Sequence, residues 1–117
     1  MSNRRTLPLH DLIVYRVARE LLVAVQAARI SNPGLREQAL RAAAAVALNI
    51  AEAVGRPSRA DQRRVYGIAR GEASETFAAL DLAEAAGFCT LADARCGKYL
   101  AERAYALLSG LMRVSRP

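Results

Sequence analysis

The chain has 117 residues, of which 53% are hydrophobic, 24% charged and only 5% aromatic. This composition argues against disorder and, because much of the apolar share is alanine, against an all-β fold. The length suits a single domain over residues 1–117, and no apolar run approaches the roughly 20 residues that span a bilayer. The two cysteines, Cys89 and Cys96, match neither a disulfide framework nor a metal or redox spacing. We therefore expect a helical, cytoplasmic protein that does not bind a membrane.

Turn-forming residues divide the chain into four predicted helices, at about residues 9–30, 35–54, 58–86 and 90–114. The run Ser-Asn-Pro-Gly at 31–34 separates the first two, and Gly55 with Pro57 ends the second. Ser58 and Thr90 each stand three residues before an aspartate, a variant of the capping box that predicts a helix start. Short connections between four helices predict an all-α fold, an antiparallel up-down four-helix bundle.

The predicted first and third helices carry apolar faces that are broad for so small a core. In the first helix, Leu9, Ile13, Val17 and Leu21 recur at helical spacing, and Leu22 widens the band. An apolar band that the core does not cover is a self-association surface. The pattern therefore predicts a homo-oligomer.

The sequence has few residues of the types that carry out catalysis or bind metals. His10 is the only histidine, so neither a Ser-His-Asp triad nor a histidine-rich metal site can be assembled. Glu72 and Glu75 could bind a metal in principle, but the Glu-x-x-His motif of ferritin-like sites does not occur. Gly67 and Gly71 lie inside a predicted helix rather than in a phosphate-binding loop. We expect no enzyme activity, no catalytic residue, no metal and no cofactor.

The net charge of +6 and the isoelectric point near 10.1 favour a polyanionic partner such as RNA or DNA. Five arginines at or near the turn between the second and third helices are the candidate nucleic-acid-binding residues: Arg56, Arg59, Arg63, Arg64 and Arg70. Glu52 and Asp61 dilute this cluster, so a solvated basic face is the alternative interpretation. Tyr66 is the only nearby ring, which favours contact with phosphates over stacking on bases.

A hairpin that turns at residues 57–58 also predicts which residues face each other across the second and third helices. The polar residues that it places between these helices are Arg41, Asn49, Glu52 and Glu75. Arg41 meets Glu75 in this register, and the alanines that flank both residues predict that the ion pair is buried. Glu52 approaches Arg63, and Asn49 approaches Tyr66. Paired polar groups between helices fix their register, so a structural network is the first interpretation and direct ligand contact is the alternative.

Short motifs in these two helices are recognisable: Arg41-Ala42-Ala43, Asn49-Ile50-Ala51-Glu52, Gly55-Arg56 and Ile68-Ala69-Arg70-Gly71, followed by Glu75. Together they resemble the four-helix bundle proteins of the 23S rRNA intervening-sequence family, which includes the accessory variability determinants of diversity-generating retroelements. The resemblance implies a ring-like homo-oligomer, with a pentamer favoured, and for the accessory determinants a basic surface that engages a reverse transcriptase and nucleic acid. In two places the chain departs from the family pattern, with Ala53 in place of glycine and Glu72 in place of serine. Glu72 adds an anion near Arg70, which weighs against binding at that end of the third helix.

These observations predict a non-catalytic oligomeric adaptor. Its arginine-rich surface would bind RNA or other nucleic acid, or a nucleic-acid-bound protein such as a reverse transcriptase. The alternative is a protein–protein scaffold that binds no nucleic acid and whose positive charge is incidental.

Overall fold

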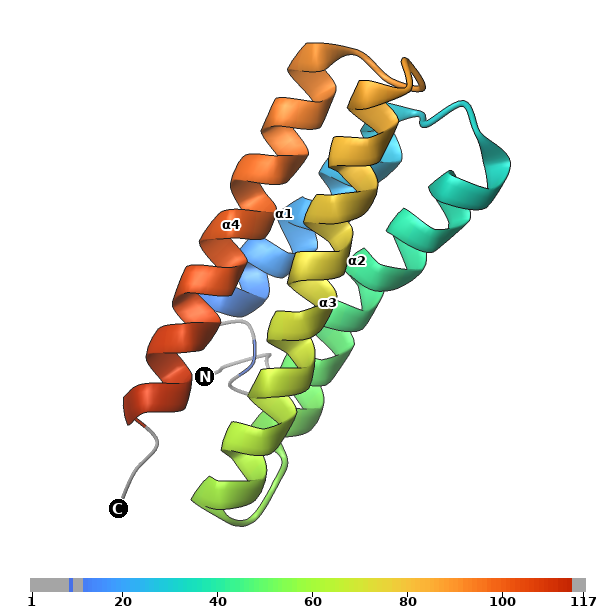
Figure 1. The fold of residues 1–117 in the computed structure, drawn as a ribbon. Coiled ribbons are helices and arrows are strands. Elements are labelled where there is room, and N and C mark those ends of the chain that lie inside the picture. Colours follow the sequence, from blue (N-terminus) through green and yellow to red (C-terminus); the bar gives the residue numbers. More distant parts are fainter. Residues whose placement is uncertain (1–8, 10–11, 115–117) are drawn as a thin grey trace, which may run out of the picture.

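The computed structural model describes residue 9 and residues 12–114. This part of the chain is all-α, with four helices: α1 (Ile13–Ala28), α2 (Pro33–Val54), α3 (Arg59–Ala85) and α4 (Leu91–Val114). Successive helices run in opposite directions, and α1 and α3 each pack against both α2 and α4 (Figure 1). The all-α class and the four predicted helices are confirmed, whereas His10 lies outside the described residues.

The first connection differs from the prediction because proline starts a helix here. Pro33 is the first residue of α2, where its missing N–H is not needed, and the Asn32 side chain accepts a hydrogen bond from Leu35 N at 2.9 Å. The helix α2 therefore begins two residues before the predicted start. At the other end of the connection, Arg29 caps α1 in the left-handed region with φ of 50°. Consequently α1 stops before the buried Ile30.

The two predicted capping residues are confirmed. Ser58 Oγ accepts a hydrogen bond from Asp61 N at 3.1 Å at the start of α3. Thr90 Oγ1 accepts one from the backbone N–H of Asp93, also at 3.1 Å, at the start of α4. Each cap satisfies a backbone donor that the first helical turn leaves without a partner.

Small side chains fill the contact between α2 and α3. Ala39, Ala42 and Ala43 on α2 and Ala69 and Ala73 on α3 are completely buried. With so little side-chain volume between them, the two helices approach closely and polar groups at their edges come within reach of one another.

The apolar stripe of α1 is rotated relative to the prediction. Val17 and Leu21 are buried as expected, but Ile13 is half exposed, and Val14 and Val25 are buried instead. The helix was expected to run from residue 9, but it begins at Ile13, so Leu9 lies outside the helix although its side chain packs into the core. None of the described helices combines the length and the apolar character needed to cross a membrane.

Candidate nucleic-acid interface

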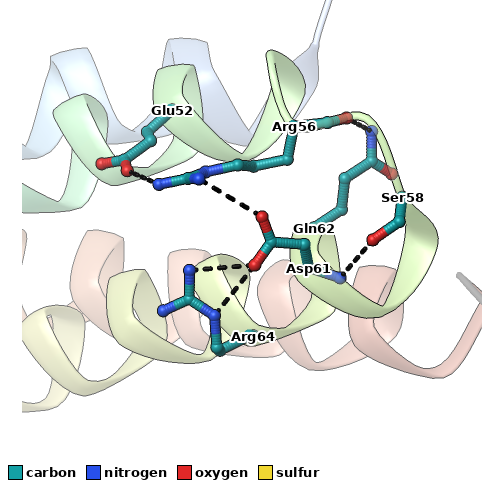
Figure 2. A network of polar contacts seen from close by, with 6 residues as sticks. All are labelled: Glu52, Arg56, Ser58, Asp61, Gln62 and Arg64. Atoms are coloured by element: carbon teal, nitrogen blue, oxygen red, sulfur yellow. Dashed lines mark hydrogen bonds and ion pairs between the residues drawn. The ribbon is translucent and has the colours of Figure 1, made fainter.

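Four of the five candidate arginines lie at the α2–α3 hairpin, where Arg56 is held on two sides. Its Nη2 donates to Glu52 Oε2 on the preceding turn, and its Nη1 lies 3.3 Å from Asp61 Oδ2 at the start of α3 (Figure 2). The backbone oxygen of Arg56 accepts a hydrogen bond from Gln62 Nε2 at 3.1 Å. The hydrogen bond that Arg56 donates to Glu52 and the charge of Asp61 raise the pKa of Arg56. Arg56 therefore ties the end of α2 to the start of α3.

Asp61 also holds a second arginine of this hairpin. Arg64 Nε and Nη2 both lie 2.9 Å from Asp61 Oδ1, within one turn of α3 (Figure 2). Arg59 is exposed and Arg63 is half-buried. Two carboxylates thus compensate half of the four positive charges at the hairpin, and the solvated-face interpretation gains support for Arg56 and Arg64.

Arg70 lies apart from the hairpin cluster, on the seam between α3 and α4. Its Nη1 donates to Ser109 Oγ at 3.1 Å, and its guanidinium lies 5.1 Å from the centre of the Tyr105 ring. Glu72 was expected beside Arg70, but its Oε1 lies 3.7 Å from Arg41 Nη1 on the opposite side of α3. Two residues along a helix differ by about 200° in direction, so the two side chains point toward different neighbours. The prediction that Glu72 places an anion beside Arg70 is therefore wrong.

The predicted pair between Arg41 and Glu75 forms, with Arg41 Nη2 2.5 Å from Glu75 Oε2. Gln38 Nε2 donates to the same oxygen at 3.2 Å. The expected burial is wrong, because the side chains of Arg41 and Glu75 are 56% and 35% exposed. Ala42 and Ala43 face the core, so Arg41 projects along the outer edge of α2, where its guanidinium keeps part of its hydration.

This arrangement shifts the pKa values of the two glutamates on α3, Glu72 and Glu75, in opposite directions. The hydrogen bond from Gln38 and the nearby Arg41 lower the pKa of Glu75. For Glu72, burial and the charge of Glu75 raise the pKa, against the opposing effect of Arg41. Glu72 Oε1 is buried and makes no hydrogen bond within the described part of the chain. The ionised form of Glu75 is thus stabilised, whereas the ionised form of Glu72 is destabilised.

The other two members of the expected polar network bond within their own helix. Asn49 Nδ2 donates to Ala45 O at 2.8 Å, one turn back along α2, rather than reaching Tyr66. Glu52 pairs with Arg56 on the next turn of α2 rather than with Arg63. Partners one turn away require less ordering of the side chains than partners across a helix–helix contact.

Several arginines that the sequence did not single out are exposed and form no ion pair among residues 12–113: Arg16, Arg19, Arg29, Arg95, Arg103 and Arg113. The ion pairs within this range engage Arg41, Arg56, Arg64 and Lys98, the last with Asp81 and Glu84 at 2.7 and 2.9 Å. The sequence indicated such unpaired arginines only through its excess of basic over acidic residues. However, whether an acid lies close enough depends on the packing of the helices.

The described residues contain no group of three or more histidine, cysteine, aspartate or glutamate side chains that could hold a metal ion. What the fold and its charge define is a basic all-α protein of four helices, whose free cations are spread over several helices.

Residues 10–110 match the family described as the 23S rRNA-intervening sequence protein, and the chain belongs to this family, as its motifs predicted. Among solved structures, a protein of unknown function from the S23 ribosomal protein family of Bacteroides thetaiotaomicron is similar, with a TM-score of 0.79 and 24% identity. The alignment covers 87% of this chain and 100% of that chain, and at this identity it supports the fold alone. No curated protein matches the chain.

Proposed function

We propose that this protein is a non-catalytic, homo-oligomeric adaptor in the cytoplasm. In this proposal its arginine-rich surface binds RNA, or an RNA-bound protein such as a reverse transcriptase. The observation that carries the proposal is the set of exposed arginines without an acidic partner in the described chain, together with the net charge of +6. Membership of a family named after an intervening sequence of 23S rRNA supports RNA as the polyanion.

Phosphate recognition by such a surface is electrostatic, because each arginine that neutralises a phosphate releases a condensed counterion. Exposed guanidiniums also offer several donors in a planar fork that fits phosphate oxygens. The test is a filter-binding titration of the purified protein with RNA over a range of salt concentrations. A steep loss of affinity with salt supports the proposal, and absence of binding at about 50 mM salt rejects it.

We propose, in addition, that the adaptor assembles as a ring-like homo-oligomer, with a pentamer favoured. Support comes from Ile13 on α1 and Leu82 on α3, which are 51% and 58% exposed and would be covered by contact with another subunit. Sedimentation velocity at micromolar concentration tests the assembly directly. A monomer under these conditions rejects it.

The same exposed apolar side chains favour a second candidate, a protein–protein scaffold that binds no nucleic acid. The two candidates differ in the salt titration and not in the sedimentation experiment. An oligomer without affinity for RNA at low salt supports the scaffold.

A further inference from the structure

A groove of about 860 Å³ runs along the outer side of α1, where α1 adjoins α2 and α4. Most of its lining is apolar and includes Leu22 from α1, Ala47 from α2 and Leu100 from α4. Two cations, Arg16 and Arg19, also line it. The groove thus combines a surface that can receive flat apolar groups with charges that can receive anions.

The two groove arginines are available to a ligand. Both are exposed, and neither forms an ion pair or a hydrogen bond through its guanidinium among the described residues. Glu20 is the only acidic side chain in the lining. This differs from the α2–α3 hairpin, where Glu52 and Asp61 already occupy Arg56 and Arg64 (Figure 2).

The α4 wall adds a cation and a ring on the same side. Arg103 follows the groove residue Leu100 by three positions, and Tyr99 follows the groove residue Cys96 by three. Residues three apart share a helix face, so Arg103 and Tyr99 lie on the side of α4 that carries Leu100 and Cys96, next to the lining but not part of it. Arg103 is exposed without an ion pair in the described chain, and the Tyr99 ring is 62% exposed.

We infer that this groove, rather than the α2–α3 hairpin, is the principal binding site for single-stranded RNA. The inference rests on the proposed function and assigns its site. Arg16, Arg19 and Arg103 contact consecutive phosphates, while unpaired bases lie against the apolar lining and stack on Tyr99. A positively charged groove with an exposed aromatic ring is how proteins bind single strands without reading their sequence.

The apolar lining is what selects a single strand over a duplex. In a duplex the faces of the bases are stacked inside the helix and only the phosphates and groove edges are accessible. A duplex therefore meets the three arginines but gains nothing from Leu22, Leu100 or Tyr99. A second copy of this chain is the rival occupant, because Val23 and Leu48 also line the groove and are exposed.

The test uses the full-length protein and a fluorescein-labelled single-stranded RNA of mixed sequence, about 12 nucleotides long, within the usual site size. Fluorescence anisotropy gives the affinity between about 50 and 200 mM salt. The groove variant is Arg16→Ala with Arg19→Ala. The charge-matched control is Arg29→Ala with Arg113→Ala, which removes two exposed cations that lie more than four positions from any residue of the groove lining. Circular dichroism melts verify that both variants fold.

We expect the groove variant to lower the slope of log affinity against log salt by about 1.4, or 0.7 for each lost phosphate contact to a single strand. The control should leave the slope unchanged. Tyr99→Ala should weaken binding at least ~5-fold without altering the slope, because stacking does not release counterions. A duplex of the same sequence should bind more weakly than the single strand.

Four results overturn the inference without overturning the proposed function. Equal losses in the groove and control variants, or a duplex that binds as tightly as the single strand, indicate diffuse charge attraction. A larger loss in Arg59→Ala with Arg64→Ala than in the groove variant returns the site to the hairpin. If Leu48→Glu dissociates the oligomer and leaves RNA affinity unchanged, the groove is a subunit interface. In these cases the wild type still binds RNA and the proposed function stands, whereas a wild type that binds no RNA overturns both.

Discussion

Arg41 on α2 and Glu75 on α3 form an ion pair across two helices, with Nη2 2.5 Å from Oε2, yet Arg41 is 56% exposed. The contact confirms the register in which α2 and α3 pack, because it joins the two residues that the hairpin predicted to face each other. Its exposure means that it marks the register without contributing much to stability, since water and salt screen the attraction.

Glu75→Ala should therefore lower the free energy of unfolding by only ~0–1 kcal/mol, the usual range for an exposed pair. Urea unfolding of the wild type, the two single alanine variants at Arg41 and Glu75, and the double variant measures the coupling. Glu37→Ala, an exposed acid of α2 without an ion pair in the described chain, is the matched control. A loss of several kcal/mol for Glu75→Ala would show that the pair is desolvated in solution and that the exposure seen here is not its state in the assembly.

Glu72→Gln should stabilise the protein at neutral pH. Because burial and Glu75 raise the pKa of Glu72, the folded chain holds this proton more tightly than the unfolded chain does. Ionised Glu72 is therefore destabilising, and the penalty develops as the pH rises from about 4.5 through the higher pKa of the folded state. Thermal melts should show Tm higher than the wild type by a few degrees at pH 7 and no difference below about pH 4.

The contribution of Glu75 has the opposite sign and does not mask this effect. Its pKa is lowered, so its stabilisation is present above about pH 4.5 and is lost as the pH falls through the folded pKa. The variant Glu72→Gln retains Glu75, and Glu37→Gln serves as the control for removing an exposed acid. A difference in Tm between Glu72→Gln and the wild type that does not vary with pH would contradict the assignment.

Two glycines of the bundle should respond to alanine with opposite signs. At Gly97 on α4, an added Cβ would lie 2.5 Å from Leu80 Cδ1, and Leu80 is completely buried and cannot move aside freely. Gly97→Ala should lower the free energy of unfolding by ~1–2 kcal/mol through overpacking. At Gly71 on α3 a Cβ would meet no atom within 4 Å, so Gly71→Ala should raise it by ~0.5–1 kcal/mol through helix propensity. Urea unfolding of both variants is the measurement, and a stabilising Gly97→Ala would show that the α3–α4 contact has spare room.

Asp61→Asn should strengthen RNA binding at low salt. Asp61 holds Arg56 at 3.3 Å and Arg64 at 2.9 Å, and its removal frees Arg64, leaves Arg56 bonded to Glu52 alone and adds one unit of positive charge. The backbone N–H that Ser58 caps is unchanged, so α3 should still begin at the same residue. We expect an affinity gain of ~2–5-fold, which corresponds to about 0.5–1 kcal/mol for a partly exposed contact.

The same anisotropy assay measures this gain, and Asp93→Asn provides the control. Asp93 occupies the equivalent third position after the Thr90 cap and makes no ion pair among residues 12–113. If both variants gain affinity equally, the effect reflects net charge alone. If neither gains, the hairpin arginines that Asp61 held do not contact RNA.

The sequence by itself determined the four helices, the caps that begin α3 and α4, and the pairing of α2 with α3. These features depend on residues close in the chain: the side chains of Ser58 and Thr90 bond backbone groups three residues ahead, and the turn at residues 57–58 sets which residues of the hairpin meet. The pairing of Arg41 with Glu75 follows directly from the position of that turn. The family membership likewise followed from motifs in α2, in α3 and in the turn between them.

Only the tertiary structure decided which polar groups are buried and which cations are free. From the sequence alone, Asp61 could pair with Arg56, pair with Arg64 or remain solvated. It pairs with both arginines because of the way the end of α2 meets the start of α3 (Figure 2). The rotation of α1 about its own axis places Ile13 toward solvent and places Arg16 and Arg19 along a groove. Helical periodicity gives the spacing of a stripe, but the broad apolar band of α1 allows several rotations. Packing against α2 and α4 selects the rotation that buries the most apolar surface.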